Sequence, residues 1–130
     1  MSDRFKQHGA FSWVELLTTD LNAAKEFYAK LFNWQLQDMP TEHGTYTVIN
    51  IGQEGVGGMM TLPPESEGAP PGWGVYVTVD NVDQTVRQAE ELGANVIVPP
   101  KDIPEVGRFA VFQDPQGAVI SVIAYAMSSQ

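Results

Sequence analysis

Apolar and polar residues follow one order of spacings along the first half of the chain. Residues 11–17 form an aromatic-led strand pattern that places Trp13 and Glu15 on one face. Asp20 then precedes apolar residues that recur every three or four positions, which is the spacing of an amphipathic helix capped by this aspartate. Three further strands are predicted at 34–39, 45–51 and 56–62, so this half reads strand, helix and three strands.

The second half repeats this order at an offset of about 60 residues. A strand is predicted at 73–79, Asp80 is expected to cap the following helix, and Gly93 ends that helix. The remaining strands are a short one at 95–98 that Pro99 and Pro100 would end, and two at 108–113 and 118–125. Residues 114–117, with the sequence DPQG, predict a tight turn between the last two strands.

Two such units in one chain usually enclose something between them, so the repeat predicts a binding cavity. The expected parts are an N-terminal arm at 1–10, module one at 11–62, a spacer at 63–72, module two at 73–125 and a tail at 126–130. The spacer sequence PPESEGAPPG is too rich in proline and glycine to form a core element. We therefore expect two modules that share one body of α+β class.

Composition narrows the classes of function. The 130 residues suffice for one domain, and the absence of cysteine excludes disulfides, a thiol nucleophile and thiolate metal sites. A formal charge of −9 disfavours nucleic acid as a partner. No apolar run approaches the roughly 18 residues that a membrane span requires. With no signal-peptide pattern at the start, we expect a cytoplasmic protein without a membrane partner.

Three segments together resemble the vicinal oxygen chelate superfamily, which includes glyoxalase I, bleomycin-resistance proteins and ring-cleaving dioxygenases. These segments are TTDLNAAKEFYAKLFNW, VDNVDQTVRQAEELGA and AVFQDPQGAVISVI, and the resemblance extends from about Phe11 to Tyr125. It implies an α+β fold in which two βαβββ modules curl into half-barrels that form a U-shaped cup. It also implies that the chain forms a homodimer.

Metal-dependent members of that superfamily take His, Glu or Gln ligands from the first and last strands of each module. The resemblance carries the ligand positions onto Trp13, Met59, Gly74 and Ser121, with Met60 or Trp73 as alternatives where the register is uncertain. None of these residue types suits a divalent ion in such a site. The two histidines, His8 and His43, fall on no predicted cup strand. We therefore expect no metal and no other cofactor.

The same positions suggest a cup lined by aromatic and sulfur-bearing side chains. A planar or apolar organic ligand would bind to these side chains by burial and stacking. The equal alternative is that they form part of the core. The residues concerned are Trp13, Met59, Trp73 and Tyr76. Glu15 lies on the face of Trp13 and could act as a general base or accept a hydrogen bond from a ligand. The alternative is a strand-end glutamate that pairs with a cation or with water.

Two further features remain open. Arg108 could pair with Glu15, hold a ligand carboxylate, or be a solvated edge residue. Gly55, Gly57 and Gly58 do not form a phosphate cradle, because no helix follows them. Glycines within a strand often mark a bulge or a close backbone approach, and we expect a kink or a contact with the partner chain there.

The sequence thus predicts a protein that sequesters or transports a small organic or aromatic molecule without a metal. One alternative is a lyase, isomerase or dioxygenase with an atypical metal site or with Glu15 as base. Another is a partner-binding module with a filled cup. The candidate ligand-binding residues are Trp13, Glu15, Met59, Trp73, Tyr76, Arg108 and Ser121.

Overall fold

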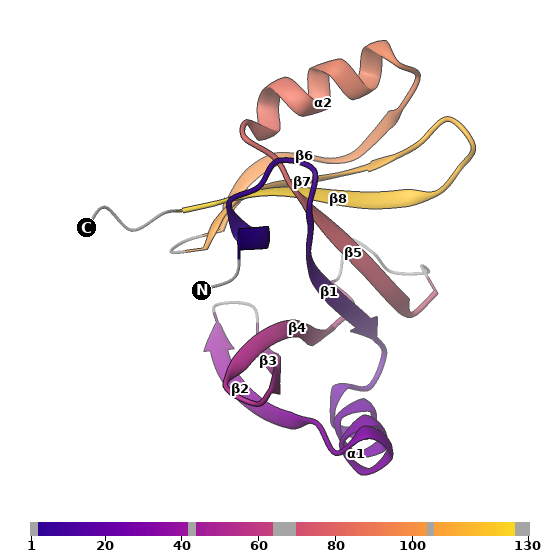
Figure 1. The fold of residues 1–130 in the computed structure, drawn as a ribbon. Coiled ribbons are helices and arrows are strands. Elements are labelled where there is room, and N and C mark those ends of the chain that lie inside the picture. The colour runs from indigo at the N-terminus through magenta and orange to yellow at the C-terminus, as the bar shows by residue number, and fades with distance from the viewer. Residues whose placement is uncertain (1–2, 42–43, 64–69, 104–105, 127–130) are drawn as a thin grey trace. The chain divides into compact units, whose positions relative to one another are not determined.

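The computed structural model describes residues 3–41, 44–63, 70–103 and 106–126. The chain forms two compact units, a first unit of Trp13–Gly74 and a second unit of residues 1–12 and 75–130. Each unit carries one strand, one helix and three further strands in that order along the chain. The α+β class and the paired βαβββ modules predicted from the sequence are thereby confirmed (Figure 1).

The first unit has strand order β2-β3-β4-β1, with β1 parallel to β4 and the other neighbours antiparallel. Its elements are β1 (Phe11–Thr18), α1 (Leu21–Phe32), β2 (Gln35–Thr41), β3 (Gly44–Ile51) and β4 (Glu54–Thr61). Asp20 caps α1 as predicted, because its carboxylate accepts a hydrogen bond of 3.0 Å from the backbone N–H of Ala23. Asn33 ends the helix in a left-handed conformation with φ of 60°.

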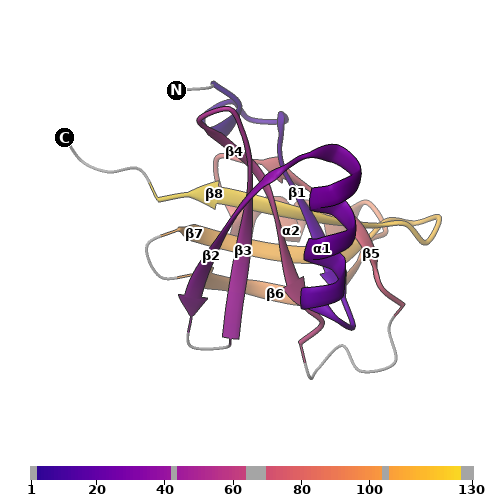
Figure 2. The same cartoon turned by 90° about the horizontal axis from the view of Figure 1, so that it is seen from below.

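Helix α1 covers one face of this sheet (Figure 2). Leu16, Ile49 and Met59 are buried beneath it, and apolar side chains from α1 pack against them. Because side chains alternate along a strand, the residues next to these in sequence point to the opposite face. The helix-free face of the first unit therefore carries Glu15 from β1 and Gly58 from β4.

The second unit has strand order β5-β8-β7-β6, with β5 parallel to β8 and the other neighbours antiparallel. Its elements are a 3₁₀ turn (Asp3–Phe5), β5 (Gly72–Thr78, of which Gly72–Gly74 fall in the first unit), α2 (Val82–Glu91), β6 (Asn95–Ile103), β7 (Gly107–Gln113) and β8 (Val119–Tyr125). Its core joins Val82 and Val86 of α2 to Ala110 and Val122 of the sheet. Helix α2 thus covers one face of this unit's sheet, as α1 does in the first unit.

The predicted cap of the second helix is wrong by one residue. Asn81, not Asp80, is the N-cap, and its side-chain oxygen accepts a hydrogen bond of 2.9 Å from the backbone N–H of Gln84. Asp80 lies one position earlier, where its own backbone N–H donates to Nδ1 of His8 at 3.0 Å. Both residue types can cap a helix, so the sequence alone did not separate them.

The predicted end of the strand at Pro99 is also wrong, because β6 continues to Ile103. The pairing of β6 with β7 shifts register between Val96 and Val98, and again between Val98 and Lys101. Proline lacks a backbone N–H, so it is tolerated at a bulge or on a strand that pairs on one side only. β6 is the last strand in the order of its unit and meets both conditions.

Other turn predictions are confirmed. Gly93 follows α2 with a φ of +102°. In the turn of residues 114–117, the carboxylate of Asp114 accepts hydrogen bonds from the backbone N–H groups of Gln116 and Ala118, at 2.9 and 3.0 Å. Gly117 completes the turn with a φ of +101°, a conformation that glycine adopts readily.

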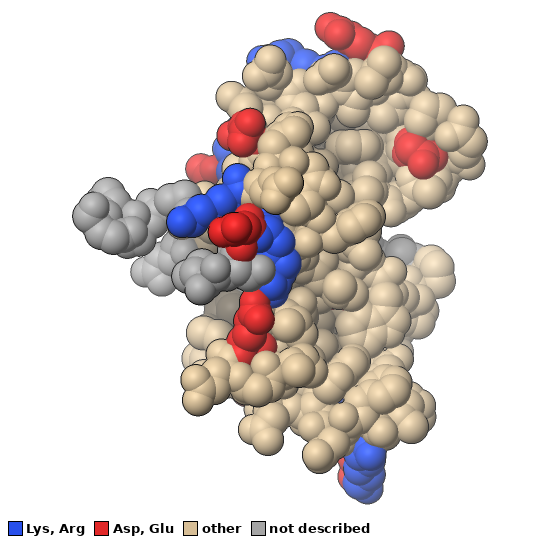
Figure 3. All heavy atoms as spheres, viewed as in Figure 1, with Lys and Arg blue, Asp and Glu red and all other residues tan. Residues whose placement is uncertain are grey.

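Charged side chains do not form one acidic patch on the face seen in Figure 3. Most of that face is uncharged, and its acidic groups stand apart from one another, several of them beside Lys or Arg. Across the described residues, neither helix has the length and apolar character to cross a membrane.

Candidate functional site

The helix-free face of the first unit holds a chain of hydrogen bonds that ends on a carboxylate. The indole Nε1–H of Trp13 donates to the hydroxyl oxygen of Tyr46 at 2.8 Å. The hydroxyl of Tyr46 in turn donates to Oε2 of Glu15 at 2.9 Å. All three side chains are partly exposed. We call this group the Glu15 chain.

Tyr46 and Glu15 come from strands that are not neighbours. Tyr46 lies on β3 and Glu15 on β1, and β4 runs between them. Two strand spacings amount to roughly 10 Å, so the tyrosine must reach across the middle strand. Gly58 is paired with Glu15 on one side and with Val48 on the other. A Cβ built on Gly58 would overlap the hydroxyl and the ring of Tyr46, so the absence of a side chain at position 58 admits the tyrosine.

The glycines before Met59 lie at a strand irregularity, while the expected contact with a partner chain stays a prediction. A register shift interrupts the pairing of β3 and β4 between Ile49 and Asn50, opposite Gly55 and Gly57. A Cβ on Gly57 would lie 2.5 Å from the backbone oxygen of Val14. Both a strand irregularity and a close backbone approach are therefore present at this segment.

The structure places Met59 differently from the expected cup wall. Its side chain has no exposed area and packs in the core under α1, on the face opposite to Glu15. Met60, the alternative in the sequence-based register, pairs with Leu17 and is partly exposed. By strand alternation Met60 shares the face of Gly58 and the Glu15 chain.

Trp73 belongs to an aromatic cluster on the helix side of the first unit. Its Nε1–H donates to the hydroxyl of Tyr28 at 3.2 Å, and its ring lies 5.3 Å from that of Tyr28 and 6.0 Å from that of Trp34. Tyr28 also packs against the core beneath α1. These contacts separate Trp73 from the face that carries Glu15.

In the second unit, Tyr76 and Ser121 are brought side by side. They are register partners on the parallel strands β5 and β8. Their neighbours Val77 and Val122 belong to the core that packs on α2, so Tyr76 and Ser121 point to the opposite face. The Tyr76 ring also lies 6.4 Å from that of Phe109.

Arg108 is engaged by two carboxylates of its own unit. Its guanidinium donates to both oxygens of Asp83, at 2.7 and 3.2 Å, and to Asp102 at 2.9 Å. The hydrogen bonds from Arg108 lower the pKa of the Asp83 carboxyl. Of the options left open by the sequence, the structure shows Arg108 paired with these two carboxylates, and ligand binding by Arg108 stays a prediction.

The chemistry of the donor set does not fit a divalent ion. The ligand positions carried over from the resemblance offer an indole, a thioether, a hydrogen and a hydroxyl, at Trp13, Met59, Gly74 and Ser121. Within the residues that the structure describes, no three His, Asp or Glu side chains lie close enough together to hold a metal. His8 contacts Asp80 in the second unit. His43 lies outside the described residues.

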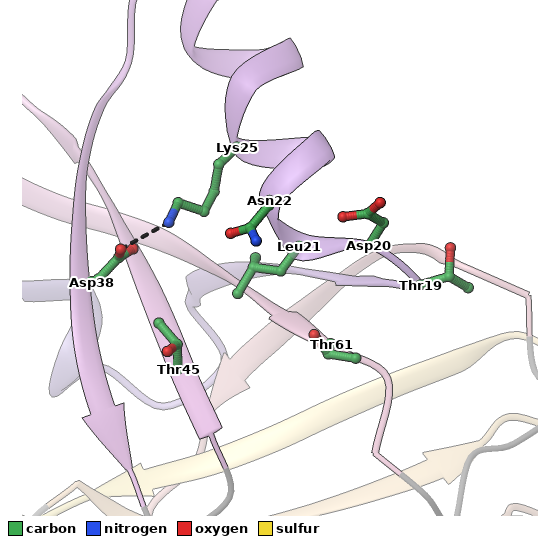
Figure 4. A pocket seen from close by; sticks show the side chains of 8 residues that line it. All are labelled: Thr19, Asp20, Leu21, Asn22, Lys25, Asp38, Thr45 and Thr61. Carbon is green, nitrogen blue, oxygen red and sulfur yellow. Dashed lines mark hydrogen bonds and ion pairs between the residues drawn. The ribbon is translucent and has the colours of Figure 1, made fainter.

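A polar cavity of about 380 Å³ opens beside the first turn of α1 (Figure 4). Its walls are Thr19, Asp20, Leu21, Asn22, Lys25, Asp38, Thr45 and Thr61. The side chains of Lys25 and Asp38 point toward each other across it, with Nζ and Oδ2 at 2.8 Å. Hydrogen bonds from Lys25 and then from Thr47 lower the pKa of Asp38. The charged groups Lys25 and Asp38 already satisfy each other, so this cavity is the weaker candidate.

Sequence reasoning missed Tyr46 and this cavity. Tyr46 sits in a strand pattern that gives no reason to select one tyrosine. The one available signal was the glycine pair Gly57 and Gly58, which indicates that something approaches the strand closely.

Comparison with known proteins agrees with the fold. A family model described as Glyoxalase/Bleomycin resistance protein/Dioxygenase superfamily matches residues 10–122. The "Putative glyoxylase CFP32" of Mycobacterium tuberculosis is 38% identical over 119 residues, which are 89% of this chain and 46% of that protein. The anthracycline biosynthesis protein DnrV of Streptomyces peucetius is 37% identical over 115 residues, 88% of this chain and 41% of that protein. The chain thus spans about half the length of these relatives.

Solved structures with the same fold are more distant in sequence. Methylmalonyl-CoA epimerase from Mycobacterium tuberculosis superposes with a TM-score of 0.64 at 15% identity, over 92% of this chain and 89% of that one. The hypothetical protein BH1468 from Bacillus halodurans superposes with a TM-score of 0.66 at 15% identity, over 95% of this chain and 99% of that one. At this level of identity the likeness concerns the fold.

Proposed function

The chain belongs to the glyoxalase/bleomycin resistance protein/dioxygenase superfamily, and from this premise we propose that the helix-free face of its first unit binds a small organic molecule without a metal ion. The observation that carries the proposal is the Glu15 chain, in which Tyr46 holds a partly exposed carboxylate in place beside Trp13. Such a combination of aromatic area and one oriented polar group is typical of small-molecule sites.

The energetics of this face suit a planar ligand. Stacking on an aromatic ring contributes on the order of 1 kcal/mol beyond the burial of apolar area. Trp13 offers such a ring, and the partly exposed side chains of Leu17 and Met60 extend the apolar surface on the same face. The name of DnrV refers to anthracycline biosynthesis, which supports a ligand with fused rings as one class to test.

Binding rather than metal-dependent chemistry is proposed because the donors at the superfamily's ligand positions do not fit a divalent ion. An indole nitrogen carries a hydrogen and has no lone pair to offer, and a thioether is a weak partner for a hard cation. Trp13 has the indole, and both Met59, which is buried on the opposite face, and the alternative Met60 offer only a thioether. The remaining positions, Gly74 and Ser121, add no anionic or imidazole donor.

An enzyme of the lyase or isomerase type is the second candidate, with Glu15 as general base. The hydrogen bond from Tyr46 favours it, because an oriented carboxylate is what proton abstraction from a bound ligand requires. Turnover distinguishes this candidate from a binder.

A ligand screen tests the proposal. Thermal-shift measurements with aromatic metabolites and antibiotics identify ligands, and titration calorimetry then compares the wild type with Glu15→Gln. The matched control is Glu26→Gln, which removes a carboxylate from an exposed position on α1 that pairs with Lys30. We expect Glu15→Gln to weaken binding about tenfold, since a hydrogen bond to a charged group is worth roughly 1.5–3 kcal/mol, and Glu26→Gln to leave it unchanged.

Equal affinity of wild type and Glu15→Gln for every ligand, or no ligand at all, would contradict the proposal. Incubation of the bound ligand in D₂O separates the two candidates. A binder leaves the ligand mass unchanged, whereas proton abstraction by Glu15 introduces deuterium in the wild type and not in Glu15→Gln.

The homodimer implied by the resemblance remains a prediction. Sedimentation velocity across a range of concentrations tests it directly, and a monomer at all concentrations would overturn it.

A further inference from the structure

We propose that Tyr46 is the residue that positions Glu15, that Gly58 makes room for it, and that the site therefore selects aromatic ligands that carry an N–H or O–H group. This inference rests on the proposed binding function of the same face and adds to it the chemical class of the ligand.

The direction of the hydrogen bonds is fixed by the donor at the start of the chain. An indole N–H can only donate, so the hydroxyl oxygen of Tyr46 accepts from Trp13. The single hydroxyl hydrogen of Tyr46 then points to Oε2 of Glu15. Glu15 consequently stands at the accepting end of the chain, and a carboxylate in this role is complementary to a donor on a ligand.

Gly58 makes this arrangement possible. The tyrosine comes from β3 and the glutamate from β1, and the ring of Tyr46 crosses the intervening strand β4 above Gly58. Any side chain at position 58 would overlap the ring and its hydroxyl. Displacement of the ring would break both hydrogen bonds at once, because they share the Tyr46 hydroxyl.

Three probes of equal ring system measure this selectivity. They are 2-naphthol, which offers an O–H donor, 2-methoxynaphthalene, which lacks it, and 2-naphthoate, whose ionised carboxylate only accepts hydrogen bonds. We expect the wild type to bind 2-naphthol about tenfold more tightly than either of the others. Tyr46→Phe, which removes one oxygen and adds no atom, should abolish most of this preference.

The matched control is Tyr28→Phe. Tyr28 also accepts a hydrogen bond from a tryptophan, Trp73, but on the helix side, and none of the carboxylates that the structure describes bonds to it. Tyr28→Phe should leave the preference for 2-naphthol intact. An unchanged preference in Tyr46→Phe, or the same loss in Tyr28→Phe, overturns the positioning role.

A readout without ligand keeps the two levels of the proposal apart. In a ¹H–¹⁵N spectrum, the indole resonance of Trp13 should shift in Tyr46→Phe and in Gly58→Ala, because its acceptor is lost or displaced. It should stay in place in Gly74→Ala, where an added Cβ meets nothing within 4 Å. If the indole resonance of Trp13 does not shift in Tyr46→Phe, the hydrogen bonds of the Glu15 chain are refuted. A shifted indole with no probe bound by the wild type instead refutes the binding function and leaves the geometry standing.

Discussion

Substitution by alanine should lower the free energy of unfolding strongly at Met59 of β4 and only slightly at the adjacent Met60. Met59 has no exposed area and fills the core between the sheet and α1. Truncation to alanine removes the transfer free energy of the lost atoms and leaves a cavity, which together cost about 2–5 kcal/mol for a buried methionine. Met60 is partly exposed on the other face, so Met60→Ala should cost less than about 1 kcal/mol.

Urea denaturation followed by circular dichroism measures both losses. We expect the midpoint of Met59→Ala to fall strongly while the slope stays that of the wild type, which indicates a change in stability rather than in the unfolded state. In thermal unfolding the same loss should lower the midpoint on the order of 10 °C for a chain of this size. Because Met60 shares the face of Glu15, Met60→Ala should instead weaken ligand binding.

Equal costs for the two substitutions would refute this assignment of faces. So would a Met59→Ala variant with wild-type stability and lost ligand binding, since that result would put Met59 in the binding wall that the sequence first suggested. A changed urea slope in Met59→Ala would mean that the substitution alters the unfolded state. The placement of Met59 in the core would then not explain the loss of stability.

Three further outcomes are expected. Asn81→Ala should lower the free energy of unfolding by about 1 kcal/mol, and Asp80→Ala by less than about 0.5 kcal/mol, as urea titrations can show. Arg108→Gln should raise the pKa of Asp83 toward its ordinary value of 3.8, which the ¹³C shift of the carboxyl reports. Because the pair lowers the folded-state pKa, its stabilisation is complete above pH 3.8 and is lost as the pH falls through the folded-state pKa. Dialysis against a chelator should leave ligand affinity and the melting temperature unchanged, and a stoichiometric ion in the purified protein would contradict the metal-free proposal.

Element order could be predicted from the sequence because it depends on local periodicity. The helix cap at Asp20 and the turn beginning at Asp114 are formed by residues whose side chains bond to backbone a few positions away. The errors at Asp80 and Pro99 have two other origins. Two neighbouring residues could both cap the helix, and the tolerance of proline in β6 depends on its position at the end of the strand order.

The site was only partly predictable because it depends on strands far apart in sequence. Alternation along β1 placed Trp13 and Glu15 on one face, which the first unit confirms. The same argument could not assign Met59, since a shift of one residue exchanges the faces and a register irregularity interrupts this sheet. The role of Tyr46 could not be predicted from the sequence either. Its side chain extends from β3 over Gly58 of β4 to Glu15 of β1, and β3 and β1 are not neighbours in the sheet.

The indole spectrum of the protein tests the central claim most directly, since the chain has three tryptophans. Trp13 lies in the Glu15 chain, whereas Trp34 and Trp73 lie in the aromatic cluster on the helix side. Titration of a ligand that stabilises the protein should shift the ¹H–¹⁵N indole resonance of Trp13 and leave the other two in place. Shifts of Trp34 and Trp73 with an unmoved Trp13 would contradict the account.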